Sequence, residues 1–198
     1  MKAKLWMAFI ALFVFSAFTT DRTVTIFMIG DSTMANKSLN GGNWERGWGH
    51  VLGGFFSEEV HVDNHAVNGR SSKSFIDEGR WAVVLDKIKP GDYVFIQFGH
   101  NDEKADSARH TEPGTTFDDN LRRFVKETRE KGGIPVLFNS IVRRSFGHNE
   151  HAVAEDDMRK DMSKDTMAEE GNVLVDTHGK YLDSPRRVAE ELEVLLWI

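Results

Sequence analysis

The sequence predicts an α/β fold in which a parallel sheet is covered by helices on both faces. Short runs of β-branched and apolar residues alternate along the chain with stretches whose apolar residues recur at helical spacing. The length of 198 residues and the 40% hydrophobic content fit one packed domain. In such a fold, functional residues gather in the loops that follow the carboxyl ends of the strands.

The first twenty residues have the layout of a secretory signal. Two lysines precede an uncharged stretch from Leu5 to Phe18, and small residues lie at its end. The stretch, at roughly 14 residues, is shorter than the roughly 20 needed to cross a bilayer. We therefore expect residues 1–20 to be a signal peptide and residues 21–198 to form the domain. The expected location is periplasmic or secreted, without stable membrane insertion; an uncleaved anchor is the alternative.

Strands and helices are predicted in alternation after this segment. The strand candidates are Val24–Ile29, Val60–Val62, Tyr93–Phe98, Ile134–Phe138 and Val173–Val175. The helix candidates are Arg46–Phe56, Ser74–Ile88, Phe117–Lys131 and Asp156–Glu169. Pro90-Gly91 and Gly132-Gly133 follow two of these helices and are typical helix endings.

The segment from Ser184 to the end of the chain is predicted to be helical. Ser184 and Pro185 suit a cap and a first helical position, and Val188, Leu192 and Leu195 recur on one face. The sequence then stops without a polar cap or a following strand. We therefore expect the last strand of the sheet, and the loop after it, to be missing from the given sequence.

Composition excludes several functional classes. The formal net charge is −6, and basic residues form no run longer than two, which disfavours nucleic acid or an anionic membrane as partner. The chain has 0 cysteines, so disulfides, thiolate metal sites and cysteine nucleophiles are excluded. Any chemistry must therefore use oxygen and nitrogen side chains.

The first candidate motif is Gly30-Asp31-Ser32-Thr33, directly after the first predicted strand. A serine there lies at the carboxyl edge of the sheet, on a turn whose amides can point toward a bound oxyanion. A loop that only caps a helix is an equally good interpretation of these four residues alone.

The second motif is Asn68-Gly69-Arg70-Ser71-Ser72-Lys73-Ser74, after the second predicted strand. Gly69 can bring a bare backbone amide close to a substrate, while Ser74 is suited to cap the next helix. A plain capped turn is the alternative.

The third motif is Gly99-His100-Asn101-Asp102, after the most hydrophobic internal strand. An asparagine amide is a neutral donor suited to stabilising an oxyanion. Three such loops after successive strands would converge on one edge of the sheet. The chance placement of all three motifs is much less probable than the chance occurrence of any one of them.

With these three motifs, the chain resembles the SGNH, or GDSL-type, hydrolases, and among them the rhamnogalacturonan acetylesterase-like carbohydrate esterases. The motifs occur in the family's order. The resemblance implies a flavodoxin-like three-layer α/β/α sandwich with Ser32 as nucleophile. It also implies an oxyanion hole formed by the backbone amides of Ser32 and Gly69 and by the Asn101 side chain. Enzymes of this kind use neither metal nor organic cofactor.

One family motif has no match. The resemblance implies a general base and its orienting acid from a D-x-x-H motif near the carboxyl end, whereas Asp176-Thr177-His178 is one residue short and precedes a helix. We therefore expect a structural role for His178 and expect the sequence to end before the Asp/His pair. His100 is expected to support the oxyanion loop.

The other histidines and two tryptophans are weaker candidates for the site. His65 has no recognised partner, and His148 and His151 are expected in a solvated loop. Trp44 and Trp48 are candidates for an apolar platform under a sugar ring, with helix packing an equally good interpretation for Trp48.

The predicted function is a serine esterase that removes O-acetyl groups from a polysaccharide such as rhamnogalacturonan or pectin, with activity impaired by the missing base. The alternatives are a GDSL-type lipase or thioesterase, and a non-catalytic carbohydrate-binding or truncated product.

Overall fold

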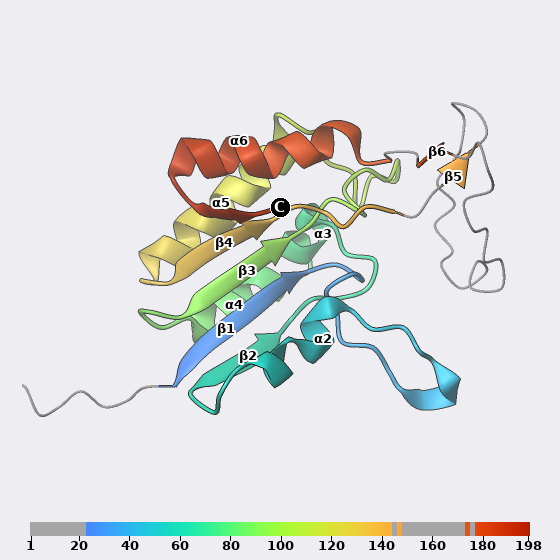
Figure 1. The fold of residues 1–198 in the computed structure, drawn as a ribbon. Coiled ribbons are helices and arrows are strands. Elements are labelled where there is room, and N and C mark those ends of the chain that lie inside the picture. The colour runs from blue at the N-terminus through green and yellow to red at the C-terminus, as the bar shows by residue number, and fades with distance from the viewer. Residues whose placement is uncertain (1–22, 144–145, 148–172, 175–176) are drawn as a thin grey trace, which may run out of the picture.

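A computed structural model describes residues 23–143, 146–147, 173–174 and 177–198. Its centre is a five-stranded sheet in the order β2-β1-β3-β4-β7, in which all neighbours are parallel (Figure 1). The strands are β1 (Val24–Gly30), β2 (Val60–Asn64), β3 (Tyr93–Gln97), β4 (Ile134–Phe138) and β7 (Leu195–Trp197). This is the 2-1-3-4-5 order of flavodoxin-like folds, so the predicted α/β class is confirmed.

The order of the strands creates a topological switch point between β1 and β3. The chain moves from β1 outward to β2 and then crosses back to β3 on the other side of β1. The loops that leave β1 and β3 therefore diverge, and this switch point is where ligands bind in open α/β sheets. The predicted Ser32 and Asn101 loops leave these two strands.

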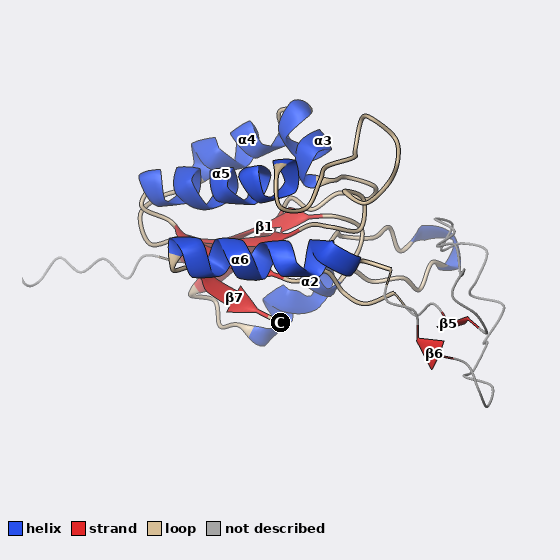
Figure 2. Ribbon diagram, turned by 90° about the horizontal axis from the view of Figure 1, so that it is seen from above, coloured by secondary structure: helices blue, strands red, loops and turns tan. Residues whose placement is uncertain are grey.

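Most helices cover one face of the sheet. These are α3 (Ser72–Asp77), α4 (Arg80–Lys87), α5 (Thr116–Glu130) and α6 (Asp183–Leu192). They form one buried core with Phe27, Ile29, Val94, Ile96 and Leu137, which alternate along β1, β3 and β4 as period-two strands require. Figure 2 shows α3, α4 and α5 on this side of the sheet and α2 on the other.

The opposite face is covered less completely by the described residues. There α2 (Trp48–Leu52) packs near Ile26 and Met28 and is followed by a 3₁₀ turn (Gly53–Phe55). Beside them a trough of about 970 Å³ lies over β3, β4 and β7. Its lining includes Tyr93, Phe95, Val136, Phe138, Leu195 and Trp197, and none of its lining side chains is charged.

Two predicted helices differ from those observed. The predicted helix Arg46–Phe56 is confined to α2 and its 3₁₀ turn, because Gly47 is extended and Gly53 begins the tighter turn. The predicted helix Ser74–Ile88 is divided into α3 and α4, because Gly79 adopts a left-handed conformation with φ 71°. Phe117–Lys131 corresponds closely to α5.

The predicted cap of α3 is also displaced. Ser71, not Ser74, is the N-cap, and its side chain accepts from the Ser74 backbone N–H. The Ser74 hydroxyl in turn accepts from the Ser71 backbone N–H, which completes a capping box.

The prediction that the last strand is missing was wrong. The helix α6 ends at Leu192, where Glu193 takes a left-handed conformation with φ 49°, and Leu195–Trp197 then pairs in parallel with Val136–Phe138. Leu195 therefore belongs to an edge strand and not to the helical face on which we expected it. A short apolar run is ambiguous between helix and strand until its pairing partner is known.

The remaining predictions concern small or undescribed parts. Val173–Leu174 forms β6, which pairs antiparallel with β5 (Phe146–Gly147) outside the main sheet. The predicted signal peptide 1–20 and the predicted helix Asp156–Glu169 lie outside the described residues. Among the described helices, none is long and apolar enough to span a bilayer.

Candidate functional site

Ser32 lies on a tight turn that begins where β1 ends. The buried carboxylate of Asp31 accepts hydrogen bonds from the Thr33 N–H at 2.9 Å and the Thr33 hydroxyl at 2.8 Å. This aspartate-centred turn presents the half-buried Ser32 at the carboxyl edge of the sheet. Burial raises the pKa of Asp31, although the two bonds from Thr33 oppose the rise.

Gln97, at the end of β3, forms hydrogen bonds with this turn, with α2 and with the residue that follows β4. Its Oε1 accepts from Trp48 Nε1 at 2.7 Å and lies 3.1 Å from the donating Thr33 hydroxyl. Its Nε2 donates to the Asn139 carbonyl at 2.8 Å. Gln97 was not among the site residues predicted from the sequence, although an amide in an otherwise apolar strand is a signal for such a role.

The Gly69 loop lies next to the Ser32 turn. The Val67 N–H donates to the Gly30 carbonyl at 3.0 Å, so the loop after β2 is joined to the end of β1. Gly69 has φ 73°, a left-handed conformation that glycine adopts without a Cβ penalty.

Asn101 completes the group. Its buried side-chain Nδ2 donates to the Arg70 carbonyl at 3.1 Å, which joins the loop after β3 to the residue that follows Gly69. The structure therefore brings Ser32, Gly69 and Asn101 to one edge of the sheet, as the three motifs predicted.

The donors of these loops are available to a ligand. Within the described residues, neither the Ser32 N–H nor the Gly69 N–H has a hydrogen-bond partner. Asn101 Nδ2 uses one of its two hydrogens for Arg70 and keeps the other. Two backbone amides and one side-chain amide in one place are able to stabilise a developing oxyanion.

His178 lies beside the site with both ring nitrogens engaged. Its Nε2 is 3.0 Å from the Ile141 carbonyl oxygen, which can only accept, so Nε2 carries a hydrogen. Its Nδ1 is 2.7 Å from the Glu103 carboxylate. The ring is buried, and these contacts leave it no nitrogen for Ser32, which agrees with the structural role expected from the sequence.

His100 packs against His178, with 4.5 Å between ring centroids. Burial, aided by the positive charges of His178 and Arg143, lowers the pKa of His100 to about 3, so the imidazole is neutral near pH 7. Arg143 donates to the His100 carbonyl at 2.8 Å and pairs with Glu103 at 2.6 Å. Glu103 and Arg143 thus hold the two histidines together, a network that sequence analysis did not identify.

The remaining candidates lie in different surroundings. His65 has partners after all, because its Nε2 is 3.0 Å from Asp63 Oδ2. Trp48 is tied to Gln97 and packs on Phe138, whereas Trp44 is 80% exposed. Packing is therefore the better interpretation for Trp48. His148 and His151 lie outside the described residues.

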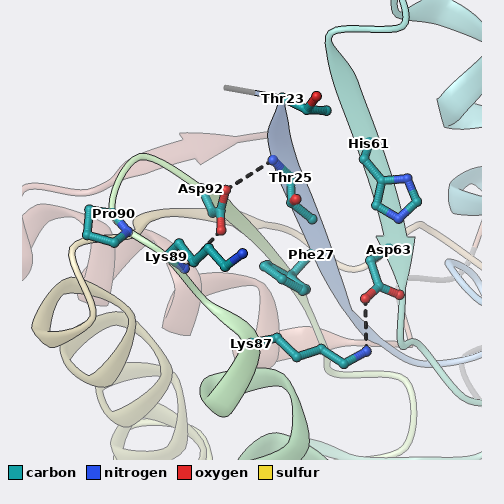
Figure 3. Close-up of a pocket in the computed structure, with 9 residues that line it drawn as sticks. All are labelled: Thr23, Thr25, Phe27, His61, Asp63, Lys87, Lys89, Pro90 and Asp92. Atoms are coloured by element: carbon teal, nitrogen blue, oxygen red, sulfur yellow. Dashed lines mark hydrogen bonds and ion pairs between the residues drawn. The ribbon is translucent and has the colours of Figure 1, made fainter. Parts of the chain in front are cut away.

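A second cavity, of about 670 Å³, is remote from this edge (Figure 3). It lies near the amino ends of β1 and β3, where Asp92 accepts from the Thr25 N–H at 3.1 Å. Lys87 donates to Asp63 at 3.1 Å across it. Asp92 also accepts from the Lys89 backbone N–H at 2.9 Å. Within the residues that the structure describes, no three His, Asp or Glu side chains are placed to hold a metal ion.

The fold and the three loops agree with the family comparison. Residues 28–193 match the family of GDSL-like lipases and acylhydrolases. The chain belongs to this family and is, by family, a carboxylic ester hydrolase.

Named relatives support this membership. "Probable rhamnogalacturonan acetylesterase YesY" of Bacillus subtilis (strain 168) is 40% identical over 162 residues, which is 79% of this chain and 71% of that protein. "Rhamnogalacturonan acetylesterase RhgT" of the same organism is 42% identical over 137 residues, 68% of this chain and 57% of that protein. The structure of protein YxiM from Bacillus subtilis superposes with a TM-score of 0.66 at 24% identity, covering 89% of this chain and 43% of that one. At this identity the likeness shows the fold.

Proposed function

We propose that this chain is an exported carbohydrate O-acetylesterase in which Ser32 is the nucleophile. The observation that carries the proposal is the convergence of the Ser32 turn, the Gly69 amide and the Asn101 amide on one edge of the sheet. The names of the relatives support acetylated rhamnogalacturonan or a similar pectic polysaccharide as substrate. The chain spans 71% and 57% of the lengths of these two relatives.

The chemistry follows from the positions of the donors. Ser32 Oγ attacks the carbonyl carbon of an acetyl ester, and the carbonyl oxygen becomes an oxyanion next to the two backbone amides and Asn101. The bond between the acetyl carbon and the sugar oxygen then breaks, and the proton lost by Ser32 ends on that oxygen, so the sugar leaves as an alcohol. Water then hydrolyses the acetyl-serine, which gives acetic acid and restores the Ser32 hydroxyl. Each donor is worth roughly 3 kcal/mol of transition-state stabilisation, about a hundredfold in rate.

Neither of the two histidines beside the site, His178 and His100, is suited to act as the base. His178 is held by Glu103 and Ile141, and the lowered pKa of His100, about 3, makes it a poor proton acceptor. We propose that the 198-residue chain is therefore slow. In the serine-protease template, the oxyanion hole and binding alone retain roughly 10³ to 10⁴ over water.

The test compares acetate release from a soluble acetyl ester by the native chain, Ser32→Ala and Ser38→Ala. Ser38 lies on the same loop and is exposed, so it is a matched serine control. Slow release that is lost in Ser32→Ala and kept in Ser38→Ala supports the proposal. Equal release by the native chain and Ser32→Ala contradicts the nucleophile assignment. Fast Ser32-dependent release contradicts the proposal of a missing base, and His178→Ala would then identify or exclude that histidine.

Two further measurements separate the alternatives. Comparison of acetyl with long-chain acyl esters distinguishes a carbohydrate acetylesterase from a lipase or thioesterase. Titration with acetylated pectin fragments and a thermal melt distinguish a folded binding protein from a truncated product, which would neither bind nor melt cooperatively. For export, the amino terminus of material recovered outside the cytoplasm should begin near residue 21.

A further inference from the structure

We propose that Asp102 is a positioning residue that locks the Gly69 loop to the Asn101 loop and so sets the spacing of the oxyanion donors. The inference rests on the proposed function, in which those donors act together. Asp102 itself touches no reacting atom in this scheme, because its side chain is fully buried behind the two loops.

One side of the Asp102 carboxylate holds the loop that contains Gly69. Oδ1 accepts from the Ser72 hydroxyl at 2.5 Å, and the Ser72 N–H lies 3.1 Å from both carboxylate oxygens. Ser72 is the first residue of α3 and is three residues beyond Gly69. The start of the helix and the end of the Gly69 loop are therefore tied to Asp102 by two donors of a single residue.

The other side of the carboxylate holds the turn that contains Asn101. Oδ2 accepts from the Gly99 N–H at 3.1 Å, which closes the turn around Asn101. Gly99 has φ 137°, and a Cβ there would lie 2.1 Å from Ser140 Oγ, so this conformation of the turn requires glycine. The same carboxylate thus fixes a residue on each side of the Arg70–Asn101 contact.

Asp102 is in turn held from behind. The Thr111 hydroxyl donates to Oδ1 at 2.9 Å, and the single hydrogen of the Tyr181 hydroxyl is shared between the Thr111 carbonyl, which is nearer, and the Asp102 carbonyl at 3.1 Å. The segment after β3 therefore contacts the carboxylate of Asp102, and the segment before α6 contacts its backbone.

The donors around the side chain require a carboxylate. Ser72 N–H, Ser72 O–H, Gly99 N–H and Thr111 O–H all point at its two oxygens. Asparagine offers one acceptor oxygen, and its NH₂ group would face a donor. Burial raises the pKa of Asp102 to about 6, and the negative charge of Asp31 adds to the rise. Burying this acid therefore has a free-energy cost that the hydrogen bonds to the two loops partly offset.

The experiment compares the native chain with Asp102→Asn by thermal melt, by kcat and KM on a soluble acetyl ester, and by the ¹H–¹⁵N signals of the Gly69 amide and the Asn101 side chain. We expect kcat to fall by about 100-fold with KM within about two-fold, as for a small displacement of catalytic donors. The Gly69 and Asn101 signals should shift at temperatures well below the melt. A folded Asp102→Asn with unshifted signals and unchanged kcat overturns the proposal.

A matched serine pair covers the case in which Asp102→Asn does not fold. Ser72 and Ser184 are both fully buried serines at a helix start, and Ser184 hydrogen-bonds the buried Asp118 instead of Asp102. Ser72→Ala should shift the Gly69 signal and lower kcat, whereas Ser184→Ala should do neither. Equal effects of the two variants overturn the proposal.

The two proposals fail separately. If the native chain and Ser32→Ala release acetate equally, the proposed function fails. The Gly69 and Asn101 signals in Asp102→Asn and Ser72→Ala still decide whether Asp102 sets the donor positions.

Discussion

Replacement of Gln97 by methionine should destabilise the fold through the polar groups that it leaves behind. Gln97 is 3% exposed, and methionine has nearly the same length without a donor or strong acceptor. The change removes the acceptor of Trp48 Nε1–H, at 2.7 Å, and the donor to the Asn139 carbonyl, at 2.8 Å. Thr33 loses less, because its hydroxyl also donates to Asp31 at the shorter distance of 2.8 Å.

The magnitude follows from the two orphaned groups. A buried donor or acceptor left without a partner costs about 1–3 kcal/mol. Trp48 and Asn139 are both half-buried, so water can replace part of each bond and the lower half of that range applies. We therefore expect Gln97→Met to lower the free energy of unfolding by about 2–4 kcal/mol.

Urea unfolding of Gln97→Met, Trp48→Phe and the double variant measures this effect. Trp48→Phe removes the Nε1–H donor, so the penalty of Gln97→Met should fall by about 1 kcal/mol in that background. A loss below about 0.5 kcal/mol for Gln97→Met, or the same loss in both backgrounds, would refute the argument that Gln97 stabilises the fold through Trp48 and Asn139.

Three further predictions concern the supports of the site and fold. The raised pKa of Asp102, about 6 in the fold against 3.8 ordinarily, means that the folded state holds its proton more tightly. Relative to Asp102→Asn, the native chain should therefore lose about 3 kcal/mol of unfolding free energy as the pH rises from about 4 to about 6. A difference in unfolding free energy between the two proteins that does not change over this pH range would contradict this. Gly79→Ala should lower the free energy of unfolding in urea by about 1 kcal/mol, because Gly79 has a left-handed φ and open space around its Cβ position. Gly99→Ala should lower it by roughly twice as much or more, because the new Cβ would also meet Ser140. Equal losses would show that the clash with Ser140 is relieved. Arg187→Met should lower the free energy of unfolding by about 1 kcal/mol at neutral pH. Burial alone would raise the pKa of Asp118, but hydrogen bonds, of which the one from Arg187 is the largest, outweigh burial and lower that pKa. This stabilisation is present above about pH 4 and is lost as acid protonates Asp118, so a penalty that persists at low pH would point to lost packing instead.

The first four strands and the placement of the three motifs were predictable from local sequence. Apolar runs of strand length ending in glycine or an amide are enough to place loops at the carboxyl edge, and the parallel sheet then brings Ser32, Gly69 and Asn101 together. The division at Gly79 was not predicted, because a glycine within a helical pattern is often tolerated.

The features that failed prediction depend on contacts far apart in the chain. Leu195–Trp197 becomes a strand only because the edge of β4 is available to it, and the helical spacing of Leu195 gives no sign of that partner. The roles of Gln97 and Glu103 rest on contacts with Trp48 and His178, 49 and 75 residues away. Spacing along the sequence carries no information on such pairs.

The central claim, that Ser32 is the acyl-accepting nucleophile, is tested most directly by finding the acetyl group on the protein. The native chain is incubated with an activated acetyl ester, quenched in acid and mapped by peptide mass spectrometry, with Ser32→Ala and Ser38→Ala in parallel. The account predicts one acetyl group on the peptide that contains Ser32, retained in Ser38→Ala and absent from Ser32→Ala. Ester turnover without acetylation of Ser32, or equal acetylation of Ser38, would contradict it.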